Sequence, residues 1–538
     1  MMAAIMLSQK YGPEHKIAVC ERRPGRPASP SDDTVWSDIA RFYLLGIGHR
    51  GQSCFEKFGV MDDFIKASVQ VNGRRDWAPG KTKVEEGRIT PARKTVASRV
   101  LPRDKLVGVL YHHLVENYVS ETNNTTNIDL LYGYEVDPIS FGNDKDSEDF
   151  VTVRISKCAD LAPNEDDDND DEETCDVDSY ELATAKLLIG ADGSARTVAN
   201  AMERIDAERV QNLNPLVRPF SKKPFQVTRF VDDNPRVYKS VPIRLPADWP
   251  CDLNYSARSS DSRITLEALP SDDKGNLCAL LLMKPDDELA QGNVEASKLR
   301  AFFDKEFPQF GALIGDEEMA RVATKSASAL PAFRYAGPRL NMGSRTLILG
   351  DAAHTVKPYY GLGANSALED VQMLSDALDD ASKSTEDGDR DSIIPSAVNL
   401  FSDRRSGDAE ALVTISRNMD RPGKLFFFTF ILPLILDGIF HKLAPKIFGP
   451  NMFGMFQLQG VGFKQIQRKK RFDRTLQMTC LGTMFAGMAW SVKTMLSVLA
   501  RVSGKSQGVV SAITASTLAL AVFLRKATAS KTATAETD

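Results

Sequence analysis

The chain has 538 residues, too many for one compact hydrophobic core, so its length predicts two closely associated domains with further appendages. A hydrophobic content of 42% is typical of a globular protein, and a net charge of -5 excludes the overall basic field that nucleic-acid binding needs. The 7 cysteines and 6 histidines are scattered, without a CxxC pair or ligand spacing. This pattern indicates a reducing compartment and predicts no metal site.

The N-terminal residues have the pattern of part of a dinucleotide-binding unit. Residues 2–9 predict a helix, and residues 16–21 predict a short apolar strand that ends at Glu21. In such a βαβ unit a glycine-rich turn precedes the first helix, and an acid at the end of the second strand binds ribose. Here no first strand or Gly-x-Gly-x-x-Gly turn precedes the helix. We expect a helix whose front has been cut away, through a truncated gene model or an alternative start; the alternative is an ordinary helix–strand opening with a chance glutamate.

Two kinds of segment occupy the middle of the chain. Residues 164–173 are almost wholly acidic, so the stretch 143–181 predicts a disordered loop between two strands, 150–156 and 184–190. Four β-rich runs further along predict an antiparallel sheet that would form a substrate lid. These runs are residues 225–230, 237–243, 263–269 and 277–283.

The most specific pattern in the chain begins with a strand that is followed by an acid. Residues 345–350 predict a buried strand, and Asp351 comes directly after it. An acid there lies at the carboxyl edge of a sheet, where ligands bind in α/β folds. Its carboxylate can accept hydrogen bonds from a sugar-alcohol chain.

A loop without side-chain bulk follows this acid. Pro358, Gly361 and Gly363 let the backbone approach a flat ring system closely. The helix predicted over residues 363–380 then points its N-terminus, with unpaired N–H groups and a partial positive charge, at that ring. This geometry would stabilise negative charge that develops on the ring.

This strand, acid, loop and helix resemble the "GD" motif of the group A flavoprotein monooxygenases, and Gly190-Ala-Asp-Gly193 resembles the same family's "DG" motif. The resemblance implies a Rossmann-like FAD-binding domain, the cofactors FAD and NADPH, and O2 as a co-substrate. Where the family usually continues Ser-x-Val-Arg, this chain has Arg196-Thr-Val-Ala199, a departure that bears on how the nicotinamide cofactor is handled. The cofactor-binding residues that the resemblance implies are Glu21, Arg41, Arg103, Asp192, Gly193, Gly350, Asp351, Pro358, Gly361, Gly363, Ala364 and Asn365.

Within that family the chain most resembles the kynurenine 3-monooxygenases, over residues 2–475 without the acidic loop. The resemblance is carried by residues 44–51 and 101–106, together with the hydrophobic C-terminus. It implies hydroxylation of L-kynurenine to 3-hydroxykynurenine. Substrate-binding roles then fall on three residues, namely Arg74, Arg75 and Asn418.

Alternatives stay open for the substrate and for several residues. The two arginines would suit a substrate carboxylate, or they are ordinary surface residues. His354 and Tyr360 are weak catalytic candidates; His354 would otherwise structure the turn beside the cofactor, and Tyr360 would pack. The chain as a whole could instead be another flavoenzyme of this scaffold that acts on a quinone or isoprenoid lipid, or an inactive truncated homologue that does not hold FAD.

The C-terminal third is rich in apolar segments. Residues 508–524 are uncharged and apolar, and they predict a membrane anchor. Residues 478–500 predict an amphipathic helix on or near the membrane, and the basic cluster 468–471 would lie on anionic lipid head groups. The resemblance implies placement at the mitochondrial outer membrane.

These observations predict a mixed α/β (α+β) protein with a Rossmann-like FAD-binding domain, an inserted antiparallel β-sheet substrate domain and C-terminal membrane-associated helices. We expect the first part of the FAD-binding domain, N-terminally truncated, over residues 1–215, and its second part over 331–424. The substrate sheet falls between them, over 216–330. A helical membrane-associated region, 425–500, and an anchor with a polar tail, 501–538, complete the chain.

Overall fold

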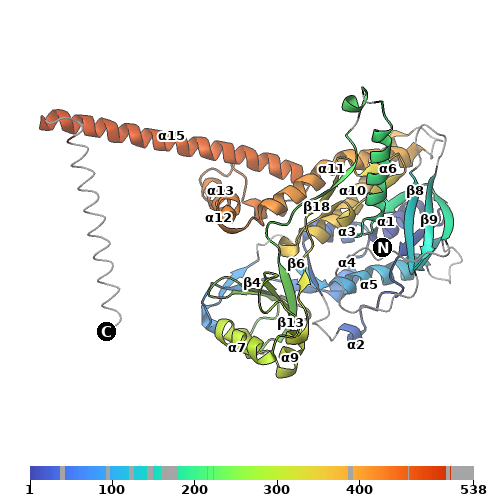
Figure 1. Cartoon of the computed structure of the whole chain (residues 1–538), viewed down its shortest axis with the longest axis horizontal. Coiled ribbons are helices and arrows are strands. Elements are labelled where there is room, and N and C mark those ends of the chain that lie inside the picture. The colour runs from blue at the N-terminus through green and yellow to red at the C-terminus, as the bar shows by residue number, and fades with distance from the viewer. Residues whose placement is uncertain are drawn as a thin grey trace. The chain divides into compact units, whose positions relative to one another are not determined.

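A computed structural model describes residues 1–36, 43–92, 97–119, 127–141, 150–158, 180–504 without 215, 222, 386–391 and 459, and residue 509. The chain forms two compact units. The first comprises Met1–Leu432 and Met452–Gln467, and the second comprises Pro433–Asn451 and the residues from Arg468 on (Figure 1). The first unit contains both the Rossmann-like part and a large antiparallel sheet.

The Rossmann-like sheet is described as two separate pieces. In the first, β1 (Ile17–Glu21) runs parallel to β7 (Ile128–Tyr132). In the second, β11 (Leu188–Gly190) runs parallel to β20 (Thr346–Ile348), which also pairs with β19 (Asn341–Met342). Among the described residues, no strand pairs with the remaining edge of β1 or of β11.

Helices surround these strands and share their hydrophobic core. Helix α10 is central, because it packs against α11, α3 and α1. Met2, Ile5 and Met6 of α1 are buried in this core, which explains why such a short apolar segment is helical. The helices are α1 (Met2–Tyr11), α2 (Asp33–Trp36), α3 (His49–Lys57), α4 (Met61–Ala67), α5 (Arg103–Leu114), α6 (Thr197–Gln211), α10 (Leu362–Ser384) and α11 (Ile393–Asn418).

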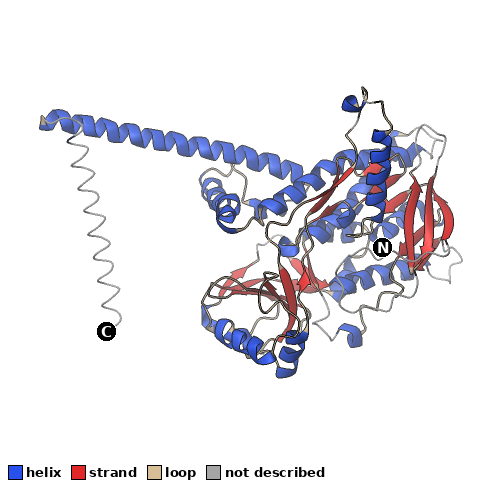
Figure 2. Ribbon diagram, in the orientation of Figure 1, coloured by secondary structure: helices blue, strands red, loops and turns tan. Residues whose placement is uncertain are grey.

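The second core of this unit lies under a seven-stranded sheet. Its strand order is β17-β13-β16-β15-β14-β4-β5, with β14 and β4 parallel and the other neighbours antiparallel. One face of the sheet packs against α7 (Ala296–Glu306), α8 (Pro308–Gly311) and α9 (Asp316–Thr324), as Figure 2 shows. The strands are β4 (Gly73–Trp77), β5 (Arg88–Pro91), β13 (Val237–Arg244), β14 (Leu253–Arg258), β15 (Thr265–Pro270), β16 (Asn276–Met283) and β17 (Ser328–Ala329).

Smaller sheets connect these two parts. Three of the four β-rich runs predicted as one sheet lie in the seven-stranded sheet, but the run at 225–230 does not. It forms β12 (Gln226–Arg229), which pairs with β18 (Arg334–Gly337). That part of the expectation was wrong because pairing partners are set by tertiary contacts rather than by local pattern. The remaining strands are β2 (Leu44–Ile47), β3 (Val69–Val71), β6 (Ser98–Pro102), β8 (Tyr134–Ser140), β9 (Val151–Lys157), β10 (Tyr180–Ala185) and β21 (His354–Thr355).

The expected fold class is confirmed, with some differences in the connections and the C-terminal part. The predicted strand 184–190 is two strands, β10 and β11, and the acidic residues 164–173 lie outside the described residues. Helix α15 runs from Phe463 to Ser503 without a break, longer than the helix predicted over 478–500. The proposed anchor at 508–524 lies outside the described residues apart from Val509. The C-terminal helices that precede α15 are α12 (Gly423–Phe426), α13 (Leu432–Leu443) and α14 (Met452–Phe456).

Candidate active site

Asp351 follows β20 closely, at the carboxyl end of that strand. Gly350 before it has a φ of 63°, a left-handed conformation that suits glycine and turns the chain sharply out of the strand. The Asp351 side chain is exposed, yet dehydration by the surrounding protein raises its pKa, although His354, Arg196 and Arg103 act to lower it. Because Asp351 meets solvent and is also dehydrated by protein, we infer that it lies in a hollow of the surface. The same electrostatic coupling shows that Arg103, at the start of α5, lies near Asp351.

The loop after Asp351 leads into the N-terminus of α10. Gly361 has a φ of 61°, and a Cβ there would approach the Gly46 carbonyl oxygen to 3.4 Å. At Gly363 a Cβ would lie 3.8 Å from an Asp351 carboxylate oxygen and 3.6 Å from Val356, so Gly363 faces the same hollow as Asp351. The short turn Pro358–Tyr360 precedes these glycines. The N-terminal N–H groups of α10 therefore begin beside the Asp351 carboxylate.

Asn365, in the first turn of α10, joins this helix to the turn after β2. Its side-chain oxygen accepts hydrogen bonds from the N–H groups of Gly48 at 2.9 Å and Gly51 at 3.2 Å. Its side-chain nitrogen donates to the Gly46 carbonyl at 2.9 Å and to the Gly361 carbonyl at 2.5 Å. These contacts fix the glycine loop, and a direct contact of Asn365 with a cofactor stays a prediction. Ala364 lies in the same helical turn, partly buried against the core.

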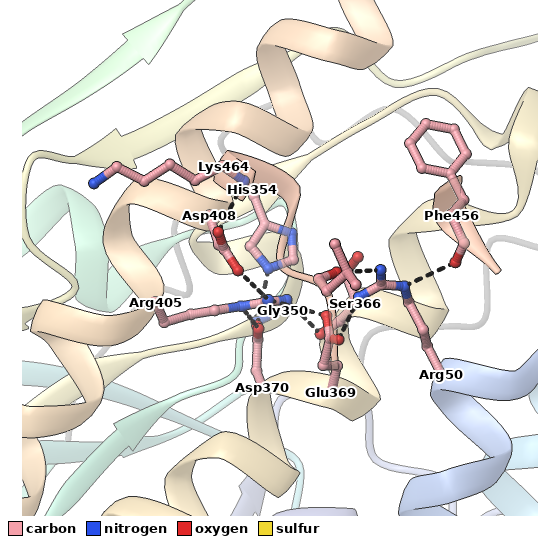
Figure 3. A network of polar contacts seen from close by, with 11 residues as sticks. Arg50, Gly350, His354, Ser366, Glu369, Asp370, Arg405, Asp408, Phe456 and Lys464 are labelled. Atoms are coloured by element: carbon pink, nitrogen blue, oxygen red, sulfur yellow. Dashed lines mark hydrogen bonds and ion pairs between the residues drawn. The ribbon is translucent and has the colours of Figure 1, made fainter. Parts of the chain in front are cut away.

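A buried ionic network stabilises the turn at Gly350 (Figure 3). The Asp370 carboxylate accepts hydrogen bonds from Gly350 N–H at 2.7 Å and from Arg405 Nε at 2.5 Å, and it lies 2.9 Å from His354 Nε2. Asp370, His354 and Arg405 have no exposed surface. Burial alone would raise the pKa of Asp370, but Arg405 and His354 outweigh this and lower it to about 2. His354 thus lies behind the turn rather than in the hollow, which supports its structural role over that of a general base.

The same network extends to the residues that follow α14. Glu369 accepts from Arg50 at 2.5 Å and from Arg405 at 3.0 Å. Arg50 also donates to the carbonyls of Phe456 at 3.1 Å and Val461 at 2.6 Å. The positions of α3, α10 and the segment 456–461 are therefore coupled to the turn that carries Asp351.

The segment that resembles the "DG" motif contacts Asp351 through an arginine. Asp192 accepts from Val198 N–H at 2.9 Å and caps α6, while its second carboxylate oxygen is buried without a hydrogen-bond partner. Gly193 has nothing within 4 Å of the position of a Cβ, so it borders open space. Arg196 is buried with a φ of 54°, and it donates to the carbonyls of Ser194 and Asp351. Burial lowers the pKa of Arg196 to about 10.

The residues around the hollow fit the ring and sugar-alcohol end of FAD. Asp351 supplies an acceptor, Gly363 leaves space beside it, and the α10 N-terminus supplies N–H groups. The unpartnered oxygen of Asp192 is a second free acceptor. Glu21 ends β1 in an exposed position, where it accepts from Arg23 N–H at 2.9 Å, and Arg41 lies outside the described residues. No group of three or more His, Cys, Asp or Glu that could hold a metal ion occurs in the described part of the chain.

The two arginines predicted to bind substrate lie on opposite faces of β4. Arg75 is stacked on Trp77 and Trp249, with its guanidinium carbon 4.9 Å and 4.8 Å from their ring centroids. It also donates to the Val84 carbonyl at 2.7 Å, so its position is structural. Arg74 lies on the other face, in an ion pair with Asp76 at 2.5 Å.

The other predicted residues lie at the end of α11 and on the loop before α10. Asn418 is exposed near the C-terminus of α11. The Tyr360 hydroxyl donates to the Met419 carbonyl at 3.3 Å, and its ring packs near Phe430 and Phe453. Tyr360 therefore links the loop to the residue next to Asn418. Whether either residue touches a substrate stays a prediction.

Sequence reasoning missed a buried lysine in this loop. Lys357 lies 2.8 Å from both Asp232 and Asp420 and donates to the Asn234 carbonyl at 2.7 Å. It thereby ties the loop to the segment after β12 and to the residue that follows Met419. A charged residue directly before Pro358, inside an otherwise apolar turn, was the available signal.

Comparison with known proteins agrees with this architecture. A family model described as an FAD binding domain matches residues 153–390. Kynurenine 3-monooxygenase of Chaetomium globosum is 30% identical over 202 residues, which are 36% of this chain and 38% of that protein. The match to the enzyme of the same name from Salinispora tropica is 24% identical and covers 87% of this chain and 88% of that protein. The chain thus spans only about a third of the length of the fungal relatives that it matches, including that of Aspergillus oryzae at 30%.

Solved structures show the fold alone. A crystal structure of 2-methyl-3-hydroxypyridine-5-carboxylic acid oxygenase matches with a TM-score of 0.52 and 15% identity, over 80% of this chain and 92% of that chain. Residues 153–390 therefore match an FAD-binding domain family, and the chain is similar to proteins named kynurenine 3-monooxygenase.

Proposed function

We propose that the chain is an FAD- and NADPH-dependent monooxygenase that hydroxylates an aromatic substrate, with L-kynurenine as the first substrate to test and 3-hydroxykynurenine as its product. The observation that carries this proposal is the hollow formed by Asp351, Gly363 and the N-terminus of α10. The relatives named kynurenine 3-monooxygenase support the choice of substrate.

The described residues have clear tasks in such a reaction. Bound FAD would supply the redox chemistry, with NADPH as the reductant and O2 as the source of the transferred oxygen. The Asp351 carboxylate would hold the hydroxyl groups of the cofactor's sugar-alcohol chain. The N–H groups of α10 would stabilise negative charge on the ring, and the loop that Asn365 fixes would keep them in position. The sheet above the loop would orient the substrate and exclude water.

An assay of the full-length protein tests this function. Purified protein is supplied with FAD, NADPH and L-kynurenine, and both oxygen uptake and hydroxylated product are measured. Stoichiometric product supports the proposal. Oxygen uptake without product would contradict kynurenine as the substrate, and a protein without the yellow flavin spectrum would contradict the function as a whole.

A second candidate function is a flavoenzyme of the same scaffold that acts on a quinone or isoprenoid lipid. The observation that favours it is the exposed apolar surface of α15, which includes Phe485, Met488 and Trp490. Turnover of a lipid quinone, with none of kynurenine, would favour this reading. In the described part of the chain, β1 and β11 each pair with a strand on one edge only, which favours a third reading: a homologue that does not hold FAD, for which a colourless protein is the sign.

We also propose that α15 associates with a membrane, and that this membrane is the mitochondrial outer membrane. Among the described helices, only Phe463–Ser503 is long and apolar enough to cross a bilayer, and its apolar window is not buried. A Phe485→Lys, Met488→Lys double variant should float with liposomes less than the native protein, because a lysine inside the bilayer costs about 3 kcal/mol. Ser503→Lys, at the exposed end of the helix, is the matched control and should still float. Equal flotation of both variants would contradict membrane insertion of this segment.

A further inference from the structure

The face of the seven-stranded sheet that is turned away from helices α7–α9 carries a polar cluster. Strand register places Asn254 opposite Arg74, and it places Ser256 opposite both Asp76 and Glu267. Side chains alternate along a strand, so these five residues share one face. Tyr255, between Asn254 and Ser256, points the other way into the helix-covered core.

This polar face is turned toward the loop that precedes α10. Arg258, two residues beyond Ser256 on the same face, acts electrostatically on Tyr360 of that loop. Leu269, two residues beyond Glu267, packs with Leu44 and the rest of the β2–β6–β3 core. The cluster therefore lies on the side of the sheet where a substrate would meet the proposed flavin site.

Glu267 is the one charged member of the cluster that forms no close ion pair in the described part of the chain. It accepts a hydrogen bond from the Ser256 hydroxyl at 2.8 Å, and in the described part of the chain no ion pair within 4.0 Å involves it. Arg74 is already paired with Asp76. Dehydration raises the pKa of Glu267, although Arg74 acts to lower it, and its side chain keeps some exposed surface. A partly dehydrated carboxylate that only a hydroxyl contacts gains most from a ligand cation.

A second acceptor in the same cluster, on Asn254, has no hydrogen-bond donor among the described residues. The side-chain oxygen of Asn254 is buried without a hydrogen-bond partner. Buried acceptors are seldom left unpaired, because the loss of water is then not compensated. Asn254 is paired with Arg74 in the strand register, on the face that also carries Glu267. A single cationic group of a ligand on this face could therefore donate hydrogen bonds to both Asn254 and Glu267.

We propose that Glu267 is a specificity-determining residue of the substrate site, which accepts hydrogen bonds from a protonated amine on the aromatic substrate. The proposal rests on the proposed function, because it assigns the substrate class of that same site. Arg74, on the neighbouring strand, is placed to meet an anionic group of the same molecule. Substrates with an ammonium group would thus be preferred over isosteric neutral or purely anionic ones.

Ligand binding to the oxidised flavoprotein, without NADPH, tests this directly. The probes are L-kynurenine and its desamino analogue, which lacks only the α-amino group, and titration calorimetry gives the two dissociation constants. The native protein should prefer L-kynurenine, and Glu267→Gln should lose that preference by about tenfold to a hundredfold, the usual effect of a charge-assisted hydrogen bond. The analogue should bind both proteins equally. Glu288→Gln, an exposed change at a residue paired with Lys298, is the matched control and should keep the preference.

The pH dependence of binding separates a direct contact from a merely structural role. The groups that face Glu267 are Arg74 and Asp76 from β4 and Ser256 and Arg258 from β14, while β16 contributes the apolar Leu280. Amine binding should strengthen as the pH rises through the pKa of Glu267, and this rise should be absent in Glu267→Gln. In Ser256→Ala the rise should move to higher pH, because the carboxylate loses its hydroxyl donor.

The outcomes distinguish the two proposals. A preference for the amine that persists in Glu267→Gln, or that is absent in the native protein, would overturn the assignment of Glu267. A preference that Glu267→Gln removes, in a protein that makes no hydroxylated product, would uphold the binding site and refute the monooxygenase function.

Discussion

Replacing Asp351 with alanine is expected to weaken FAD binding by about tenfold to a hundredfold, the loss that follows when a charged hydrogen-bond acceptor is removed. Asp351 is an exposed carboxylate, and Gly363 at the start of α10 lies beside it. The dissociation constant is measured by quenching of flavin fluorescence as the apoprotein is titrated. Asp376→Ala, on the exposed side of the same helix α10 and paired with Lys57, is the control and should bind FAD normally.

Stability distinguishes a lost cofactor contact from misfolding in this variant. Asp370 acts to raise the pKa of Asp351, which shows that the two carboxylates repel each other. Without FAD, Asp351→Ala should therefore melt no earlier than the native protein. Because the pKa of Asp351 is raised, the carboxylate is protonated at a higher pH than that of an ordinary aspartate. As the pH is lowered, the FAD affinity of the native protein should therefore begin to fall earlier. This loss of affinity should be absent in the variant. Unchanged affinity in Asp351→Ala would remove Asp351 from the cofactor site.

Much of the cofactor loop was predictable from sequence because its signals are local. A buried strand, an acid at its end and two glycines before a helix each have a physical reason that needs no partner, and β20, Asp351 and α10 lie where these signals placed them. The hollow follows from the same residues. Gly361 has a left-handed backbone conformation, and a Cβ added there would lie 3.4 Å from the Gly46 carbonyl oxygen. This second reason for a glycine appears only in the folded chain.

The substrate face could not be predicted because it depends on strand register. Arg74 and Arg75 are adjacent, so sequence alone could not say which one faces the core. The parallel pairing of β4 with β14, across 180 positions of the chain from Asn72 to Asp252, decides this and turns Arg75 toward Trp249. The same register brings Glu267 next to Ser256, two residues that no motif connects. Lys357 likewise finds Asp232 and Asp420 only in the folded chain.

Replacing Asp370 with asparagine is expected to lower the free energy of unfolding by about 3 to 5 kcal/mol, since it leaves the Arg405 guanidinium buried without its main counterion. Arg405 would keep Glu369 at 3.0 Å, which sets the loss toward the lower end of that range. Urea denaturation monitored by tryptophan fluorescence measures the change. Asp380→Asn, at the exposed pair with Arg404, is the matched control and should change stability by less than about 1 kcal/mol.

The pH dependence of the free energy of unfolding tests the interaction between Asp370 and Arg405 independently. The folded pKa of Asp370 is lowered to about 2, so its contribution is fully present above the unfolded pKa of about 4 and is lost as the pH falls from there toward 2. The native protein should lose about 2 kcal/mol more than Asp370→Asn across this window. A double variant, Asp370→Asn with Arg405→Met, should be more stable than Asp370→Asn alone because it removes the unpaired charge. If the double variant were instead less stable by the sum of the two single losses, Asp370 and Arg405 would act independently, and the turn at Gly350 would have to be held by other contacts.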